Sequence, residues 1–311
     1  RGRTWPVKLA CKTRFIVSKH LHEPRSETDA QAKVKRTPLK LTTHSITLGS
    51  TPTYMNTDPV RSFNADSLPV HIFAHQDDMS SAAATEVNDY LCATINNQGS
   101  AAAILATGNS QIQFLEKLLA IGEVDWSKMT LFHMDEYLGI DKDHSASFRK
   151  YMRERVEQVV RPAAFHYIKG DALEPLKECR RYTDLLAAQP IDLCCLGVGE
   201  NGHIAFNDPP VADFSDPESV KIVQLDEVCR QQQHGEGHFP TFDSVPQYAF
   251  TLTIPALCQA NKMVCLCPET RKAKIAKIAL QGEISTNCPV SYLRKQSQCV
   301  MYMDEESASL L

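Results

Sequence analysis

From about residue 66 onward, short apolar runs alternate with helix-forming segments, and this alternation limits the folds open to the chain more than any other feature. The runs are apolar throughout, which is typical of strands that are covered on both faces. Strands that alternate with helices along a chain form mostly parallel sheets. The predicted strands are 70–74, 101–106, 129–133, 191–197, 248–254, 263–267 and 299–303. The predicted helices are 79–97, 111–122, 147–160, 176–188 and 271–282.

The fold class predicted from this pattern is α/β, with one Rossmann-like domain over residues 61–311 that contains a mostly parallel sheet with helices on both faces. The segment before it differs in composition. Its first forty residues carry eleven Lys or Arg against three acids, and the stretch that follows is rich in Thr, Ser and Pro. We expect residues 1–60 to be a largely disordered, basic extension, with an organelle-targeting presequence as the alternative.

Composition excludes several classes of function. A formal net charge of −4 provides no general attraction for nucleic acid or for an acidic membrane surface, and no run reaches the roughly 18 apolar residues of a membrane span. The eleven cysteines include no C-x-x-C pair, and most lie in apolar runs. We therefore expect a reduced, cytoplasmic protein without a bound metal, whose partner is a small molecule.

Four of the predicted strands run directly into polar segments. These are "TGNS" (107–110), "MDEY" (134–137), "VGENGH" (198–203) and "PETRKA" (268–273). The carboxyl ends of parallel strands meet at one edge of a sheet, where ligands bind. We expect the four segments to face one site.

Two of these segments have the chemistry of a phosphate site. "TGNS" precedes a predicted helix, whose first amides, together with the hydroxyls of Thr107 and Ser110, can donate to an anion. Lys272 lies in the first turn of another helix, where the helix dipole disfavours a cation unless an anion is near. The alternatives are an ordinary turn in which Ser110 is the N-cap, and a solvated lysine.

The other two segments carry groups that can move protons. Asp135 and Glu136 end a strand, and burial can raise a carboxyl pKa toward working pH, although one of the two can instead cap the next turn. His203 follows three glycines, among them Gly199, that let the main chain turn and a ligand approach. Either Asp208 or Glu200 can orient its imidazole for acid-base work.

"GVGENGHIAFNDPP", together with "HMDEYLGI" and "TGNS", resembles the signature of the glucosamine-6-phosphate deaminase (isomerase) family over about residues 66–305. The resemblance implies a Rossmann-like fold and conversion of glucosamine 6-phosphate and water to fructose 6-phosphate and ammonia, without an organic cofactor or metal. It also leaves open a homo-oligomer. The related 6-phosphogluconolactonases share the fold but typically read T-A-S-L-F-P after the histidine.

The resemblance assigns catalytic roles by position. His203 matches the histidine that opens the sugar ring, with Asn201 beside it and Asp208 in the same relay. Asp135 matches the aspartate that moves a proton between C2 and C1, and Glu136 stands beside it, where we expect substrate contact.

The resemblance also assigns the substrate-binding positions. The phosphate loop falls on Thr107, Gly108, Asn109 and Ser110. Lys272 matches the phosphate lysine, and Gly199 lies where the backbone meets the sugar.

Three departures from the family pattern bear on these assignments. Asp208 stands where the family has Glu, about 1.5 Å longer, so the relay to His203 is direct, water-mediated or taken over by Glu200. Asn109 replaces a glycine of the phosphate loop. The family's arginine after "LDEVCR" has no match; His234 and His238 stand there, in a segment we expect to be a lid.

The predicted activity is hydrolytic deamination with aldose-ketose isomerisation of glucosamine 6-phosphate or a close amino sugar phosphate. A lactonase of the 6-phosphogluconolactone type is one alternative, with His203 activating water. A sugar-phosphate sensor without turnover is the other.

Overall fold

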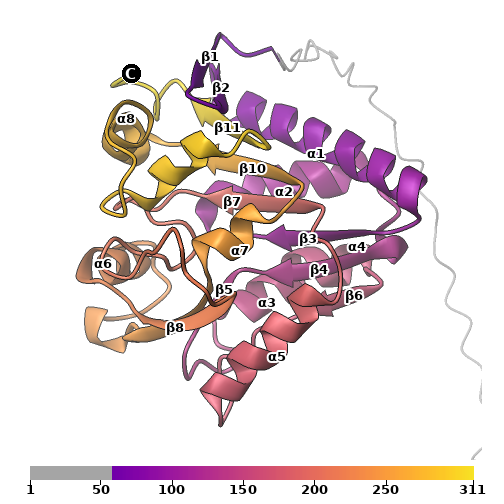
Figure 1. Cartoon of the computed structure of the whole chain (residues 1–311), viewed down its shortest axis with the longest axis vertical. Coiled ribbons are helices and arrows are strands. Elements are labelled where there is room, and N and C mark those ends of the chain that lie inside the picture. Colours follow the sequence, from indigo (N-terminus) through magenta and orange to yellow (C-terminus); the bar gives the residue numbers. More distant parts are fainter. Residues whose placement is uncertain (1–57) are drawn as a thin grey trace, which may run out of the picture. The chain divides into compact units, whose positions relative to one another are not determined.

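The computed structural model describes residues 58–311, which belong to one compact unit (Figure 1). The expectation of disorder for residues 1–60 falls almost wholly outside this range. The strands are β1 (Arg61–Ala65), β2 (Leu68–Phe73), β3 (Ala101–Leu105), β4 (Met129–His133), β5 (Asp135–Tyr137), β6 (Ala164–His166), β7 (Leu193–Gly197), β8 (Val220–Gln224), β9 (Tyr248–Leu252), β10 (Lys262–Cys267) and β11 (Cys299–Asp304).

The helices follow the predicted segments closely and add two more. They are α1 (Gln76–Gln98), α2 (Asn109–Ile121), α3 (Phe148–Met152), α4 (Gln158–Val160), α5 (Pro175–Ala187), α6 (Glu227–Gly235), α7 (Ile254–Cys258) and α8 (Ala273–Gln281). A π-helical segment, Arg153–Glu157, joins α3 to α4, so the predicted helix 147–160 is one continuous helical stretch. No described helix is long and apolar enough to cross a membrane.

The main sheet has eight strands in the order β1-β2-β11-β10-β7-β3-β4-β6, and all are parallel except the edge strand β1. This confirms the predicted α/β class. Alternate residues of each central strand enter different cores, because successive side chains of a strand point to opposite faces. In β7, Cys194 and Leu196 belong to one apolar core, while Leu193 and Cys195 belong to the other.

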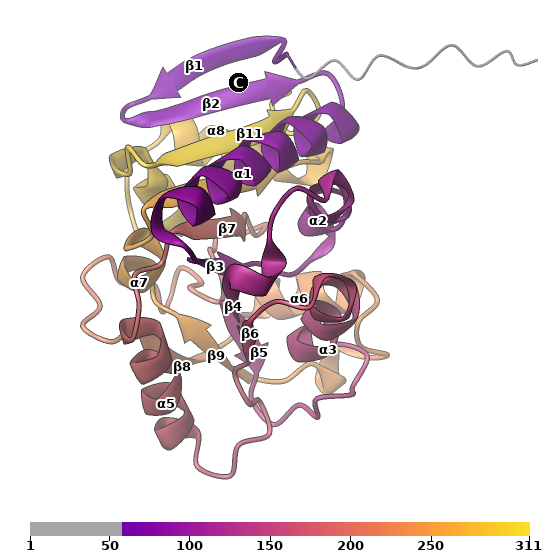
Figure 2. The same ribbon diagram turned by 90° about the vertical axis from the view of Figure 1, so that its right-hand side faces the viewer.

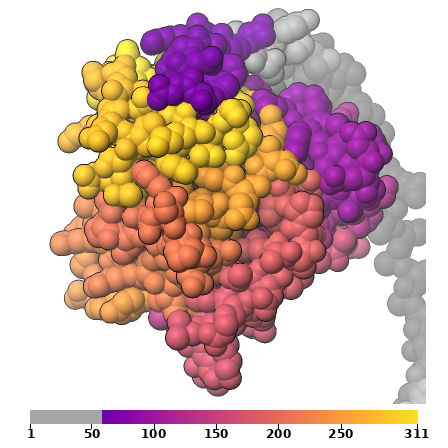
Figure 3. All heavy atoms as spheres, in the orientation of Figure 1, coloured from indigo at the N-terminus to yellow at the C-terminus, as the bar shows by residue number. Residues whose placement is uncertain are grey.

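Helices cover both faces of the main sheet, as predicted. On one face α1, α2 and α3 supply the apolar side chains, and α1 and α2 lie in front of the sheet in Figure 2. On the other face α5, α7 and α8 contribute. Segments from the second half of the chain cover most of the face seen in Figure 3, where the region of α5 protrudes at the lower edge.

The expectation that 248–254 joins the parallel sheet is wrong. Its strand, β9, pairs antiparallel with β5 and β8 in a separate three-stranded sheet. Periodicity could not reveal this, because a buried antiparallel strand is as apolar as a parallel one. The chain passes from β4 to β5 at Met134, whose carbonyl accepts a hydrogen bond from the Leu252 amide at 2.8 Å. The residue after this junction is Asp135, so the second sheet fixes the position of that carboxylate.

Candidate active site

The four polar segments that follow the strands line one pocket at the carboxyl edge of the main sheet, as their placement predicted. The pocket is bordered by Thr107, Gly108, Asn109, Ser110, Asp135, Gly199, His203 and Lys272 from the predicted set. Asn201, Asp208 and Glu136 do not line it. These last three residues support the pocket from behind, each in a different way.

The phosphate-loop segment forms the N-terminus of α2. Gly108 is the N-cap and has a φ of 98°, a backbone conformation that L side chains rarely adopt, although a Cβ there would meet nothing within 4 Å. Conformation therefore favours glycine here. Asn109 is the first residue of the helix, so the loop keeps a helical start despite the missing second glycine. The first amides of α2 lack partners within the helix and suit an anion.

Lys272 gives the same pocket a cation. The residue is 3% exposed, and within residues 58–311 its ammonium has no hydrogen bond or ion pair. Burial, with the charge of Arg271 as a second cause, lowers its pKa from 10.5. A buried ammonium without a partner is costly. It is the strongest sign in the described chain that an anion binds here.

The segment "GENGH" folds back on itself to present His203. The Gly199 amide donates to the His203 carbonyl at 3.0 Å, and the Gly202 amide donates to the Gly199 carbonyl at 3.0 Å. A Cβ on Gly199 would fall on the imidazole of His203. The position of the His203 ring thus requires glycine at 199, and Gly199 also borders the pocket where substrate contact is predicted.

Asp208 orients the imidazole directly. Its Oδ1 lies 2.8 Å from Nδ1 of His203, so the shorter acid still reaches the ring. Burial alone would raise the pKa of Asp208, but its contacts with His203, Asn201 and the Asp226 amide lower it below 3.8. Glu200, the alternative orienting acid, instead pairs with Arg271. His203 therefore has its Nδ1 beside a buried carboxylate, an arrangement that suits general acid-base chemistry.

Asn201 acts behind the histidine and does not face the pocket. Its Nδ2 donates to Asp208 at 2.9 Å and to Asp226 at 3.0 Å, while its Oδ1 accepts from the His203 amide at 3.0 Å. Asp226 is also the N-cap of α6, where it accepts from the Cys229 amide. Asn201 thereby joins the histidine loop to the start of α6.

Asp135 faces the pocket as a poorly solvated carboxylate. The residue is 7% exposed, and its Oδ1 has no hydrogen-bond partner in the described chain. Burial, and secondarily the charge of Glu136, raises the pKa of Asp135 well above 3.8. A pocket-lining carboxylate with a raised pKa and a buried oxygen that lacks a hydrogen-bond partner fits a general base.

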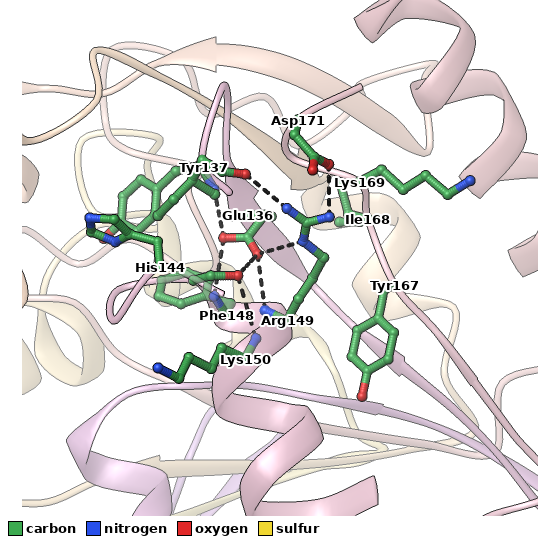
Figure 4. A network of polar contacts seen from close by, with 12 residues as sticks. Glu136, Tyr137, His144, Phe148, Arg149, Lys150, Tyr167, Ile168, Lys169 and Asp171 are labelled. Carbon is green, nitrogen blue, oxygen red and sulfur yellow. Dashed lines mark hydrogen bonds and ion pairs between the residues drawn. The ribbon is translucent and has the colours of Figure 1, made fainter. Parts of the chain in front are cut away.

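The expectation that Glu136 contacts substrate is not supported by its position, because Glu136 is fully buried beneath the start of α3 (Figure 4). Its carboxylate accepts from the Ser147 hydroxyl at 2.8 Å and from the amides of Phe148 and Arg149 at 3.1 and 2.9 Å. The Arg149 guanidinium lies 3.4 Å away and also binds Asp171. The capping alternative considered for one of the two acids applies to Glu136.

Sequence reasoning missed a further wall of the pocket. The added residues are Ser145, Ala146, Ser147, Phe148, Tyr151, Gln232, Gln233, Glu236 and Arg271. His238, suggested as a replacement for the missing arginine, also lines the pocket, whereas His234 does not. Arg271 was detectable, since it adjoins Lys272. The α6 residues follow β8, a strand that the apolar pattern did not reveal, so they carried no such signal.

The structure also brings His203, Asp208 and Cys229 together, with one donor atom from each within 4.8 Å of the others. The Nδ1 and carboxylate oxygen of this group already face each other at 2.8 Å. His203 and Asp208 of this group are thus already paired with each other.

Comparison with known proteins identifies related sequences. The model of the glucosamine-6-phosphate isomerases/6-phosphogluconolactonase family matches residues 74–302. A glucosamine-6-phosphate deaminase of Lactobacillus delbrueckii subsp. bulgaricus is 31% identical over 222 residues, which are 71% of this chain and 92% of that protein. One from Bacillus cereus is 32% identical over 206 residues, or 66% of this chain and 76% of the relative.

Solved structures give the same fold. A monomeric glucosamine-6-phosphate deaminase is 29% identical with a TM-score of 0.72, over 78% of this chain and 99% of that one. The 6-phosphogluconolactonase of Thermotoga maritima is 18% identical with a TM-score of 0.61, over 76% and 98% of the two chains. At that identity, the second likeness concerns the fold alone.

Proposed function

The chain belongs to the glucosamine-6-phosphate isomerase/6-phosphogluconolactonase family, and from this premise we propose that it converts glucosamine 6-phosphate and water to fructose 6-phosphate and ammonia. The observation that carries the proposal is the placement of Asp135, with its free Oδ1, in the same pocket as His203 and the unpaired ammonium of Lys272. The relatives at 31 and 32% identity, both named deaminases, support this branch of the family over the lactonases.

In the proposed mechanism, the phosphate is bound at the start of α2 and by Lys272. Binding this remote group holds the sugar carbons against the acid-base residues and converts binding energy into orientation. The proposed substrate is therefore a phosphorylated sugar, and the free sugar is expected to react poorly.

His203 is proposed to open the pyranose ring. Since Nδ1 lies 2.8 Å from the Asp208 carboxylate, Nε2 is the nitrogen left to serve the substrate. It takes the proton from the O1 hydroxyl and delivers one to the ring oxygen O5 as the C1–O5 bond breaks. The product is the open-chain aldehyde, whose carbonyl makes the proton on C2 acidic.

Asp135 is proposed to take the C2 proton and return it to C1. Removal gives an enolamine, and protonation at C1 gives a C2 imine. Water adds to that imine and ammonia leaves, which yields fructose 6-phosphate. General acid-base steps of this kind typically contribute about 10²- to 10⁴-fold each.

The deciding experiment incubates the purified full chain with glucosamine 6-phosphate and measures ammonia and fructose 6-phosphate in equal amounts. A parallel assay follows hydrolysis of 6-phosphogluconolactone. Lactone hydrolysis without ammonia would overturn the proposal in favour of the lactonase. Tight binding of both compounds without turnover of either would favour a sensor.

A reducing, cytoplasmic location is part of the same proposal. The ten cysteines within residues 58–311 are all free thiols, which supports a compartment that keeps thiols reduced.

A further inference from the structure

Arg271 lines the pocket next to Lys272, yet its charge is already neutralised by the protein. Its Nη1 lies 3.0 Å from Oε1 of Glu200 and 2.9 Å from Oε1 of Glu236, and its Nε lies 2.5 Å from Oε2 of Glu269. Three carboxylates thus surround one guanidinium. None of the steps of deamination derived above uses any of these three acids.

Glu236 is the unusual member of this group, because it lines the pocket directly. It follows α6, and its side chain is only 8% exposed. Burial alone would raise the pKa of Glu236, but contacts with His238, Arg271 and Gln232 lower it to about 2. A permanent anion therefore stands at the cationic end of a pocket that is proposed to bind a second anion.

A phosphate that enters beside Lys272 meets both an attraction and a repulsion. The guanidinium of Arg271 offers planar paired donors that suit phosphate oxygens. Glu236 and Glu200 are close enough to favour the charged form of Lys272 and would repel a phosphate at the same place.

We infer that Arg271 is a further phosphate-binding residue, and that it exchanges Glu236 for a phosphate oxygen when the substrate binds. Glu200 and Glu269 keep the guanidinium in place during the exchange. Glu236 thereby acts as an internal competitor that weakens the binding of phosphorylated ligands. This inference rests on the proposed function only in taking the ligand to be a sugar phosphate.

The exchange also frees the end of α6. Gln232 donates to Glu236 at 3.0 Å and its Oε1 accepts from the Glu200 amide at 3.1 Å, so the Arg271 pairs hold this wall of the pocket. A simple structural latch would have the same contacts. The two explanations differ in one respect. If the contacts are only a latch, loss of either Arg271 or Glu236 weakens ligand binding. In an exchange, loss of Arg271 weakens ligand binding, whereas loss of the Glu236 charge tightens it.

The test compares Arg271→Gln and Glu236→Gln by titration calorimetry with fructose 6-phosphate and with inorganic phosphate. Arg271→Gln is expected to weaken fructose 6-phosphate binding about 10- to 100-fold, the range for a lost charged hydrogen bond. Glu236→Gln keeps the hydrogen bonds, removes the competing charge and is expected to tighten binding about two- to fivefold. Lys274→Gln, at an exposed position of α8, removes the same charge as Arg271→Gln; it is the matched control for that variant and should leave binding unchanged.

Shifts of both variants in the same direction would overturn the exchange and leave a latch. Unchanged binding in Arg271→Gln would overturn the phosphate contact. Arg271→Lys keeps the charge but lacks the paired donors of the guanidinium. Its affinity for fructose 6-phosphate should lie between those of wild type and Arg271→Gln, and it replaces the glutamine variant if that variant does not fold. Because binding is measured without turnover, opposite shifts in a chain that releases no ammonia would refute the proposed function alone.

Discussion

Asp135 combines the role of proposed base with a cost to the fold, so Asp135→Asn is expected to lose turnover and gain stability. The carboxyl group is 7% exposed, and its Oδ1 has no hydrogen-bond partner among the described residues. Asparagine keeps nearly the same shape and removes the charge. The substitution therefore separates the proposed role of this carboxylate in turnover from its cost to the stability of the fold.

The expected magnitudes follow from that environment. A buried polar group without a partner costs about 1–3 kcal/mol, and more when charged. We expect Asp135→Asn to add about 1–3 kcal/mol to the free energy of unfolding, or roughly 2–10 °C in Tm for a unit of this size. Loss of a general base is expected to lower kcat by at least about 10²-fold.

The stability gain is expected to depend on pH. Burial raises the folded-state pKa of Asp135 above the ordinary 3.8, so the folded chain holds this proton more tightly than the unfolded chain. Wild type then loses stability as the pH rises from 3.8 to the folded pKa, and the loss is constant above it. Asparagine has no such titration, so the advantage of the variant should grow with pH across that window.

Scanning calorimetry from about pH 5 to 8 and steady-state ammonia release measure the two effects. Asp184→Asn, an equal change at an exposed position of α5, should alter the free energy of unfolding by no more than about 0.5 kcal/mol and should leave ammonia release unchanged. A fully active Asp135→Asn would remove the base from the mechanism. A variant less stable than wild type would refute the argument from the unpaired buried charge.

Three further substitutions test the supports of the site. Asp208→Asn should lower kcat about 10²- to 10⁴-fold in steady-state assays by disturbing the tautomer of His203, and an unchanged kcat would contradict the direct relay. Gly199→Ala should cause a similar loss because its Cβ falls on the imidazole, whereas Gly235→Ala, with open space at the Cβ, should be neutral; equal activity of the two would be evidence against that contact. Glu136→Ala should cost about 3–5 kcal/mol in urea unfolding because it removes the acceptor of the amides at the start of α3 and one of the two carboxylates beside Arg149. A cost under about 1 kcal/mol would count against this capping role.

The parallel sheet could be predicted because its signal is local. Each of β3, β4, β7 and β10 is a continuous apolar run, and each lies where the pattern places it. The second sheet could not be predicted in this way. Its β5 has only three residues, and its partners β8 and β9 lie more than eighty residues further along the chain. Pairing over that separation leaves no periodic trace in the sequence.

The site was predictable to the extent that it is built from strand ends. His203, Asp135 and Lys272 all follow central strands, so parallel topology brings them to one edge, where the second sheet then fixes Asp135. The wall formed by Gln232 and Glu236 depends on how α6 docks, which is a tertiary contact without a motif. The reach of Asp208 likewise depends on the backbone path of the histidine loop, and not on side-chain length alone.

The neighbours Asp135 and Glu136 show how one dipeptide supplies two different functions. Successive residues of a strand point to opposite sides, so β5 can direct only one of the two into the pocket. The other, Glu136, accepts from the amides of α3 and lies beside the Arg149 guanidinium. Burial raises the pKa of Glu136 from 4.5, and these contacts, which favour its charged form, offset only part of that rise. That charge in turn raises the pKa of Asp135. Glu136 is thus a positioning residue for α3 that also makes its neighbour a stronger base, without touching the substrate.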